Sequence, residues 1–156
     1  MKNLQLAAAM AIVVAAVLVA SLTYQPKEAP GPRCGPYRND KTVTIDSVKI
    51  KAEVVQVPAE LEKGLGGRPC IESNQAMLFI FDKPSHYAIW MKDMHFPIDI
   101  IWISSDYKVV GLEIDVSPST YPDRFVNKDN PALYVLELRA NRAKELNISL
   151  GTPVNF

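Results

Sequence analysis

Charged and titratable side chains gather in an otherwise apolar stretch of this sequence, residues 87–103, which read YAIWMKDMHFPIDIIWI. Lys92, Asp93, His95 and Asp99 fall within eight consecutive residues of that stretch. Charges among so many apolar neighbours must reach water, a partner or a ligand, because burying an unpaired charge is costly. These four side chains are therefore the first candidates for a functional site.

They support a structural and a functional interpretation. In the structural one, which we favour, Asp99 accepts hydrogen bonds from backbone amides at the corner of the chain, and Lys92 pairs with Glu113 or Glu137. In the functional one, charged groups form the polar end of a pocket that has an apolar wall. The predicted ligand-binding residues are then Arg68, Trp90, Met91, Lys92 and Asp99, with Asp93, Glu113 and Glu137 in support.

Catalysis has weaker support, and no catalytic residue is assigned. A carboxylate pair of Asp99 with Glu113 or Glu137 could support acid–base hydrolysis if the two side chains met. The sequence has no Gly-x-Ser-x-Gly elbow, and Cys70 has no identifiable base partner. An exported hydrolase therefore remains an alternative to a binding domain.

Metal, cofactor and nucleotide sites are not predicted. His86 and His95 are the only histidines, and neither stands at a recognised metal-ligand spacing from acidic residues. Residues 64–68, GLGGR, resemble a phosphate-binding loop only in their glycines, because the Lys-Ser/Thr pair of a P-loop is missing. Tight turns explain these glycines better.

Short strands must position the candidate residues. Alternation of apolar and polar residues predicts three antiparallel hairpins. Their strands are residues 42–45 with 48–57, 77–81 with 87–91, and 98–103 with 108–116. Residues 98–103 are apolar on both faces, which is typical of a central strand. Pro58 starts a short helix over residues 59–63, and Pro97 bends the chain before a strand.

The second half of the sequence adds one long connection and further strands. Residues 117–131 contain three prolines and are predicted to lack regular structure, so that they could act as a lid. A strand over 132–138, a short helix over 139–146 and a terminal strand over 148–156 follow. This pattern predicts a mainly β fold, a small antiparallel β-barrel or sandwich with one or two short helices.

The N-terminal residues have the composition of a transmembrane or signal helix. Residues 6–22 are apolar apart from Ser21, and the amino terminus and Lys2 precede them. The length favours an uncleaved anchor that contacts the membrane through residues 4–24, although the small residues 19–21 would suit signal-peptide cleavage. Because positive flanks stay inside, the remainder is expected outside the cytoplasm as a single-pass membrane protein, or secreted or periplasmic after cleavage.

Three segments follow from this composition: a signal anchor or signal peptide at 1–22, a Pro/Gly-rich linker at 23–39 and a β-domain at 40–156. The 17 basic and 17 acidic side chains of the chain cancel. Residues 40–156 hold 13 basic and 16 acidic side chains, a net charge of −3. Scattered charges of this balance exclude a nucleic-acid partner on electrostatic grounds.

Cys34 in the linker and Cys70 in the domain are the only cysteines. An oxidising exterior would allow them to pair and so staple the linker to the domain, with a contribution of roughly 3 to 4 kcal/mol. Two independent thiols are the alternative, since the sequence does not give the distance between the α-carbons. A thioredoxin-type Cys-x-x-Cys spacing is missing.

Four stretches carry a family resemblance: KGLGGR at 63–68, MLFIF at 77–81, WMKDMHFPIDI at 90–100 and YVLEL at 134–138. Their order resembles the bacterial and archaeal domain of unknown function family 192, over residues 48–156. The resemblance implies a single, mostly antiparallel β-domain with a small helical component, often exported, and it implies no established activity. Tyr107 and Asn141 stand where this family usually has glycine.

These observations together predict a membrane-tethered extracytoplasmic β-domain that acts as a binding or accessory module. Its partner would be an envelope ligand, a sugar or a peptide, or another protein. The alternatives are an exported hydrolase that uses carboxylates near Asp99, and an envelope scaffold without a small-molecule site.

Overall fold

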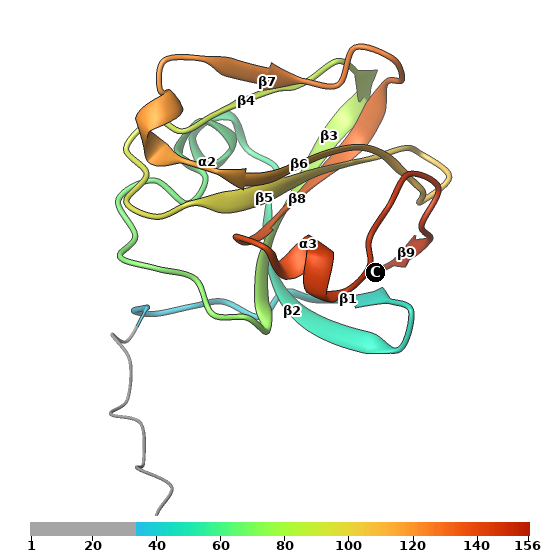
Figure 1. Cartoon of the computed structure of the whole chain (residues 1–156), viewed down its shortest axis with the longest axis horizontal. Coiled ribbons are helices and arrows are strands. Elements are labelled where there is room, and N and C mark those ends of the chain that lie inside the picture. Colours follow the sequence, from blue (N-terminus) through green and yellow to red (C-terminus); the bar gives the residue numbers. More distant parts are fainter. Residues whose placement is uncertain (1–33) are drawn as a thin grey trace, which may run out of the picture. The chain divides into compact units, whose positions relative to one another are not determined.

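Regular structure between residues 34 and 156 is mostly β-strand, as the alternating sequence pattern predicts. The computed structural model describes residues 34–156, and the predicted N-terminal helix and most of the linker lie outside them. In this part of the chain a seven-stranded sheet curls into a half-barrel, accompanied by two short α-helices (Figure 1). Within residues 34–156, no helix is long and apolar enough to cross a membrane.

The elements follow one another with mostly short connections. In chain order they are β1 Lys41–Ile45, β2 Val48–Val55, α2 Pro58–Lys63, β3 Gln75–Ser85, β4 Ala88–Trp90, β5 Ile98–Ile103, β6 Val109–Val116, the 3-10 helix η1 Pro118–Thr120, β7 Arg124–Val126, β8 Ala132–Arg139, α3 Arg142–Glu145 and β9 Val154–Asn155. The large sheet has the strand order β6-β5-β8-β3-β2-β1-β9, and β4 pairs with β7 in a separate two-stranded ribbon.

Two of the three predicted hairpins are confirmed, β1 with β2 and β5 with β6. The middle hairpin is wrong: β3 continues through the predicted turn to Ser85 and pairs with β8, while β4 pairs with β7. Since β7 and η1 lie within residues 117–131, that connection has regular structure after all. Local turn signals cannot show that a strand from later in the chain offers the better partner.

The sheet is mixed rather than purely antiparallel, because β2 and β3 run parallel, with Lys51 opposite Gln75 and Val55 opposite Phe79. A parallel pair needs a crossover of roughly a dozen residues or more. Residues 56–74 supply it with α2 and the glycine-rich loop. This crossover positions the candidate site, because it places the end of α2 next to residues of β3, β4 and β8.

Both faces of the sheet are packed, and successive residues of a strand face different cores. Every residue of β5 is buried, as predicted for a central strand. One core cluster contains Ile101 and Leu138 and includes Ala143 from α3. The other contains Ile100 and includes Ile89 from β4. This alternation decides which polar side chains of the sheet can meet.

Tyr107 and Asn141 adopt left-handed backbone conformations, with φ of 59° and 65°. These are the two positions where the family resemblance places glycine, which adopts such a φ without strain. Tyr107 stacks on Tyr134 at a centroid distance of 5.5 Å and contacts the edge of Phe156 at 5.3 Å. Glycine at position 107 would make neither contact, so the aromatic packing offsets the backbone strain.

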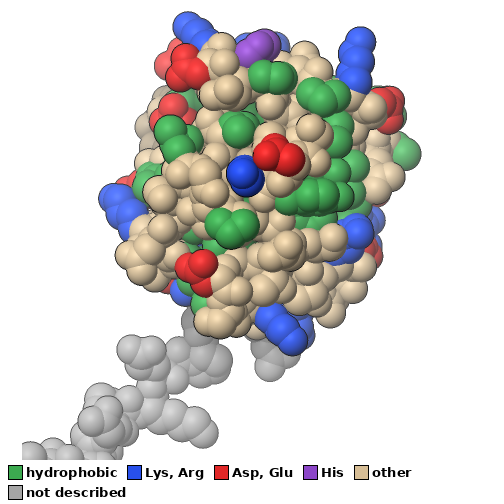
Figure 2. Space-filling view, turned by 90° about the vertical axis from the view of Figure 1, so that its right-hand side faces the viewer, with side chains coloured by type: hydrophobic (Ala, Val, Ile, Leu, Met, Phe, Trp, Pro, Cys, Tyr) green, Lys and Arg blue, Asp and Glu red, His purple; other side chains and the backbone are tan. Residues whose placement is uncertain are grey.

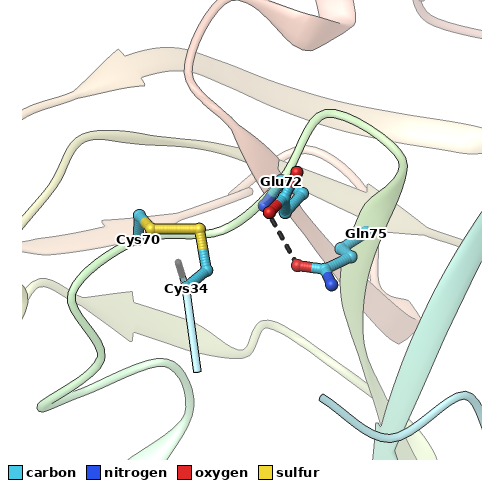
Figure 3. The surroundings of a disulfide bond; sticks show 4 residues. All are labelled: Cys34, Cys70, Glu72 and Gln75. Carbon is cyan, nitrogen blue, oxygen red and sulfur yellow. Dashed lines mark hydrogen bonds between the residues drawn. A yellow bond between two sulfur atoms is a disulfide. The ribbon is translucent and has the colours of Figure 1, made fainter. Parts of the chain in front are cut away.

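Cys34 and Cys70 form a disulfide bond, which joins the end of the linker to the crossover (Figure 3). Their α-carbons lie 4.8 Å apart, within the range that a disulfide requires. Next to the bridge, the side-chain oxygen of Gln75 accepts a hydrogen bond from the amide of Glu72 at 3.0 Å (Figure 3). The disulfide therefore fastens the linker to the segment that leads into β3.

We expect the double variant Cys34→Ser/Cys70→Ser to lose roughly 3 to 4 kcal/mol of unfolding free energy. The bridge spans a sequence separation of 36 and lowers the entropy of the unfolded chain. Urea unfolding of the full chain measures the loss. A reducing agent should bring the wild type to the stability of the double variant and leave the variant unchanged. Equal stability of the two oxidised proteins would contradict this prediction.

Candidate functional site

Asp99 satisfies backbone groups. It is 0% exposed, and its carboxylate accepts hydrogen bonds from the amides of Asp115, Asn141 and Ala143 at 2.9, 2.9 and 2.7 Å. Asp115 and Asn141 both have a left-handed backbone, with φ of 58° and 65°. The structure thus shows the structural role favoured for Asp99, although the amides belong to β6 and to the start of α3 and not to the corner itself.

Arg68 is held in an ion pair with Glu53 of β2. Its Nη1 and Nη2 donate to the two carboxylate oxygens at 3.1 and 2.5 Å, and Glu53 is buried. The guanidinium also lies 5.9 Å from the centre of the Tyr37 ring. Such a two-point contact fixes both position and orientation. Arg68 therefore lines a hollow of about 190 Å³ beside Glu53 and does not join Asp99.

Lys92 contacts α2 and the indole of Trp90. Its Nζ pairs with a carboxylate oxygen of Glu62 at 3.2 Å, so the predicted partners Glu113 and Glu137 are wrong. The same Nζ lies 5.4 Å from the centre of the Trp90 ring, and the guanidinium of Arg124 lies 4.5 Å from it. Cations over an aromatic face are attracted by its π electrons. The Trp90 ring is thus in contact with the side chains of Lys92 and Arg124 and is not an open aromatic surface on which a ligand could stack.

The carboxylate pairs considered from the sequence do not converge. In the pairing of β5 with β8, Glu137 lies opposite Ile100, whereas Asp99 lies opposite Leu138. Opposed residues share a face of the sheet and successive residues do not, so Asp99 and Glu137 point to different faces. Glu113 is exposed on β6 and lines an open hollow beside Trp102. The geometry for acid–base hydrolysis by these residues is absent.

A small cavity, which we call the inner chamber, lies between the end of α2 and strands β3, β4 and β8. Its volume is about 40 Å³. A water molecule needs roughly 10 to 15 Å³ measured in this way, so the chamber has room for about three water molecules. It is lined by Leu61, Glu62, Lys63, Gly64, Leu65, Phe79, Ala88, Ile89, Trp90, Lys92, Met94 and Glu137.

Glu137 is the buried polar group of the inner chamber. It is 4% exposed, and within residues 34–156 its Oε2 has no hydrogen-bond partner. Burial raises the pKa of this carboxyl to about 8, although the positive charge of Arg68 opposes the shift. Glu137 is therefore protonated at neutral pH and can donate one hydrogen bond. An unpaired buried oxygen is costly, which favours water or a ligand in the chamber.

Gly64 makes room next to this carboxyl. It ends α2 with φ 49° and ψ −132°, a conformation that favours glycine. A Cβ there would lie 3.2 Å from the Phe79 ring and 3.9 Å from Oε2 of Glu137. The amides of residues 64, 66, 67 and 68 all donate to backbone carbonyl oxygens, so they are not free to cradle a phosphate. The turn interpretation of the glycines is the one the structure shows.

A wider outer hollow of about 510 Å³ adjoins the inner chamber. Both are lined by Glu62, Lys63 and Lys92, and Gly66, Gly67 and Asp93 complete the outer wall with Ala59. Among residues 34–156, no carboxylate forms an ion pair with Lys63. A ligand in the outer hollow would thus meet the ammonium group of Lys63, the carboxylate of Asp93 and the exposed pair of Lys92 with Glu62.

Other clusters of charge among residues 34–156 are paired internally, such as Arg38 with Asp40 and Glu60, and Arg139 and Arg142 with Glu145. On the face in Figure 2, hydrophobic side chains gather beside isolated basic and acidic ones. Within residues 34–156, no group of three or more His, Cys, Asp or Glu side chains could hold a metal ion. The inner chamber and its outer hollow are therefore the candidate site.

Of the residues predicted to bind a ligand, Trp90 and Lys92 line the inner chamber. Asp93, predicted in support, lines the outer hollow. Met91 is 1% exposed and lies within a core cluster, so it does not line the inner chamber. Met94 lines the chamber wall instead. Sequence reasoning does not identify Lys63 and Gly64 as site residues, because their pattern is that of a helix end followed by a turn. Glu137, predicted only in support, is central.

Comparisons with known proteins agree with this fold. The DUF192 family model, described as an uncharacterised ACR, matches residues 41–156. A Sinorhizobium meliloti crystal structure, described as a candidate transcription regulator, is similar at 26% identity and a TM-score of 0.67, covering 73% of this chain and 89% of that one. A Novosphingobium aromaticivorans protein of unknown function is 28% identical with a TM-score of 0.67, covering 74% and 82%. No curated protein matches.

Proposed function

The chain belongs to the DUF192 family of uncharacterised proteins, and we propose that it is a binding domain tethered to the outer face of a cell membrane. Its ligand, from the cell envelope, would occupy the inner chamber and the outer hollow. The observation that carries the proposal is the Glu137 carboxyl, which lines a cavity and has an oxygen without a hydrogen-bond partner among residues 34–156. Buried polar atoms of folded proteins are rarely left unsatisfied.

Two features support the tether and the compartment. Residues 6–22 have the length and composition of a membrane anchor, and Lys2 precedes them. The disulfide of Cys34 and Cys70 suits an exported protein, because disulfides form and persist mainly in oxidising compartments. The domain would then stand outside the cytoplasm on a single-pass anchor, or be secreted or periplasmic if the segment is cleaved.

The alternatives have less support. A hydrolase would need a nucleophile or a second carboxylate beside Glu137, and the other acidic residue of the chamber wall, Glu62, is paired with Lys92. A scaffold without a ligand would need an ordered water molecule to satisfy the unpaired oxygen of Glu137. A DNA-binding regulator needs a basic surface, whereas residues 40–156 carry a net charge of −3.

A thermal-unfolding screen of the full chain in detergent micelles tests this proposal. A compound that binds only the native state raises the unfolding midpoint by mass action. The panel contains envelope sugars, short peptides and small organic acids, each measured on the wild type and on Ala88→Leu. Ala88 is exposed and lines the chamber, so leucine should narrow it without changing charge. A midpoint shift lost in Ala88→Leu supports the site, and no shift with any compound overturns it.

Lys92→Ala should spare folding and weaken ligand binding. The pair of Lys92 with Glu62 is exposed, and such pairs contribute little to stability. Removing the ammonium group would nevertheless take a positive charge from the wall of both cavities. Lys49→Ala, at an exposed position of β2, is the matched control and should change neither property. Loss of the cooperative unfolding transition in Lys92→Ala alone would instead make Lys92 a structural residue.

A further inference from the structure

The size of the inner chamber limits which chemical group can enter it. Its volume of about 40 Å³ corresponds to about three water molecules, or two to three non-hydrogen atoms of a ligand. A carboxylate group, with three non-hydrogen atoms, has this size, whereas a sugar ring or a phosphate group is larger. The remainder of a ligand would lie in the outer hollow of about 510 Å³.

The chemistry of the wall limits the group further. Glu137 in its neutral form offers an O–H donor and therefore pairs best with an acceptor. Lys63 and Lys92 line both the inner chamber and the outer hollow, and the positive charge of Arg68, which is paired with Glu53 of β2, acts on Glu137. A ligand cation would be repelled by the unpaired charge of Lys63, since Lys92 and Arg68 are paired with Glu62 and Glu53. A neutral hydroxyl group could accept from Glu137 but would gain nothing from the unpaired charge of Lys63.

We propose that the inner chamber receives the carboxylate group of an acidic ligand, with the carboxyl of Glu137 donating a hydrogen bond to it and Lys63 and Lys92 supplying positive charge. This inference rests on the proposed binding function and names the chemical class of its ligand. A carboxylic acid that donates to a carboxylate forms a short, charge-assisted hydrogen bond. Free organic acids, acidic sugars and peptide C-termini share this group.

The affinity for a carboxylate should depend on pH, because Glu137 must carry its proton to donate a hydrogen bond. The charged groups around Glu137 are Glu62 and Lys63 from α2, Lys92 from the segment after β4, Arg68 from the crossover, and Glu53 of β2, which is paired with Arg68. Above its pKa of about 8, Glu137 is ionised and repels a carboxylate. At pH 9 about one tenth of Glu137 stays protonated, so affinity should be about tenfold lower than at neutral pH.

Acetate tests the proposal as the smallest carboxylate probe, with acetamide as its uncharged isostere. Tryptophan fluorescence of the full chain in detergent reports binding through Trp90, at constant ionic strength set with chloride. Acetate should give a saturable change at neutral pH and bind about tenfold or more tightly than acetamide, because one charge-assisted hydrogen bond is worth about that factor. Methylammonium, glucose and inorganic phosphate should each bind more weakly than acetate.

Variants of Glu137 separate hydrogen bonding from charge. Glu137→Gln retains an N–H donor but does not titrate, so it should bind acetate at pH 7 and keep that affinity at pH 9. Glu137→Leu removes the donor and should bind acetate about tenfold or more weakly. Lys63→Ala should also weaken binding, whereas Lys49→Ala should not.

The outcomes separate this inference from the proposed function. Equal binding of acetate and acetamide, or acetate binding that persists in Glu137→Leu, would overturn the carboxylate assignment. If a neutral sugar shifts the unfolding midpoint and Ala88→Leu abolishes that shift, the binding function stands and the ligand class is wrong. If neither acetate nor any compound of the screen binds, both proposals fail together.

Discussion

Replacing Asp99 with alanine is expected to lower the free energy of unfolding by on the order of 5 kcal/mol. The carboxylate accepts hydrogen bonds from the backbone amides of Asp115, Asn141 and Ala143, and Asp99 is fully buried. Leaving a buried donor without a partner costs about 1 to 3 kcal/mol, and here three donors lose theirs together. Asp115 and Asn141 also lose the contact that holds their left-handed backbones.

Asp99→Asn should lose less unfolding free energy than Asp99→Ala, and the comparison tests whether the lost hydrogen bonds cause the destabilisation. Oδ1 accepts two of the amides and Oδ2 accepts that of Ala143. The asparagine oxygen can replace Oδ1, but its NH₂ group would face the Ala143 amide, so one donor stays unpaired. Urea unfolding of the full chain should rank wild type above Asp99→Asn and Asp99→Ala lowest. Asp82→Ala, at an exposed position of β3, is the control; equal losses in all three variants would contradict the assignment.

Glu137 should make the protein less stable as the pH rises. Its pKa is about 8 in the folded protein, against an ordinary value of 4.5 in an unfolded chain. Between these values the folded state holds one proton more than the unfolded state, so unfolding free energy falls with increasing pH. The stability gained from the proton on Glu137 is complete below pH 4.5 and is lost as the pH rises through about 8. The difference of 3.5 units corresponds to on the order of 5 kcal/mol.

Glu137→Gln isolates this contribution, because glutamine does not titrate. Its unfolding free energy should lack the decline that Glu137 produces in the wild type, so the difference between the two proteins should change steadily between about pH 5 and pH 8. Hydrogen bonds from Arg142 and Arg139 lower the pKa of Glu145, so the stabilisation by Glu145 is lost at acid pH. Both proteins share this loss, and it cancels when the unfolding free energy of one is subtracted from that of the other. Glu113→Gln, at an exposed position of β6, should retain the wild-type decline. Parallel curves for wild type and Glu137→Gln would show that Glu137 is ionised throughout.

Several elements of the fold follow from local sequence, and others do not. Alternation over 48–57 and 98–103 predicts strands that β2 and β5 confirm, and Pro58 marks the start of α2. The turn residues 82–85 predict a hairpin that does not form, because β3 continues and pairs with β8. The parallel pairing of β2 with β3 is equally invisible, since a crossover is a tertiary contact between distant segments.

The candidate site shows the same division. The sequence predicts that the charged residues of 92–99 reach water, a partner or a ligand, but spacing does not assign a partner to each of them. Lys92 pairs with Glu62, thirty residues earlier, and Asp99 accepts hydrogen bonds from amides of β6 and α3. Glu137 carried a usable signal, because it is the one charged residue within the apolar run 132–138. An isolated charge inside a predicted buried strand deserves more weight than a cluster at a corner.

By itself, the sequence determined the β-rich fold class, the family, the two cysteines able to pair and the short list of polar residues set among apolar ones. The tertiary structure decided which core each of them faces, that Cys34 meets Cys70, and that Glu137 lines a cavity under the end of α2 while Asp99 points to the opposite face. The physical reason is that strand propensity and side-chain alternation act over a few residues. Strand partners, burial and the shift of a carboxyl pKa depend on contacts between segments that lie tens of residues apart.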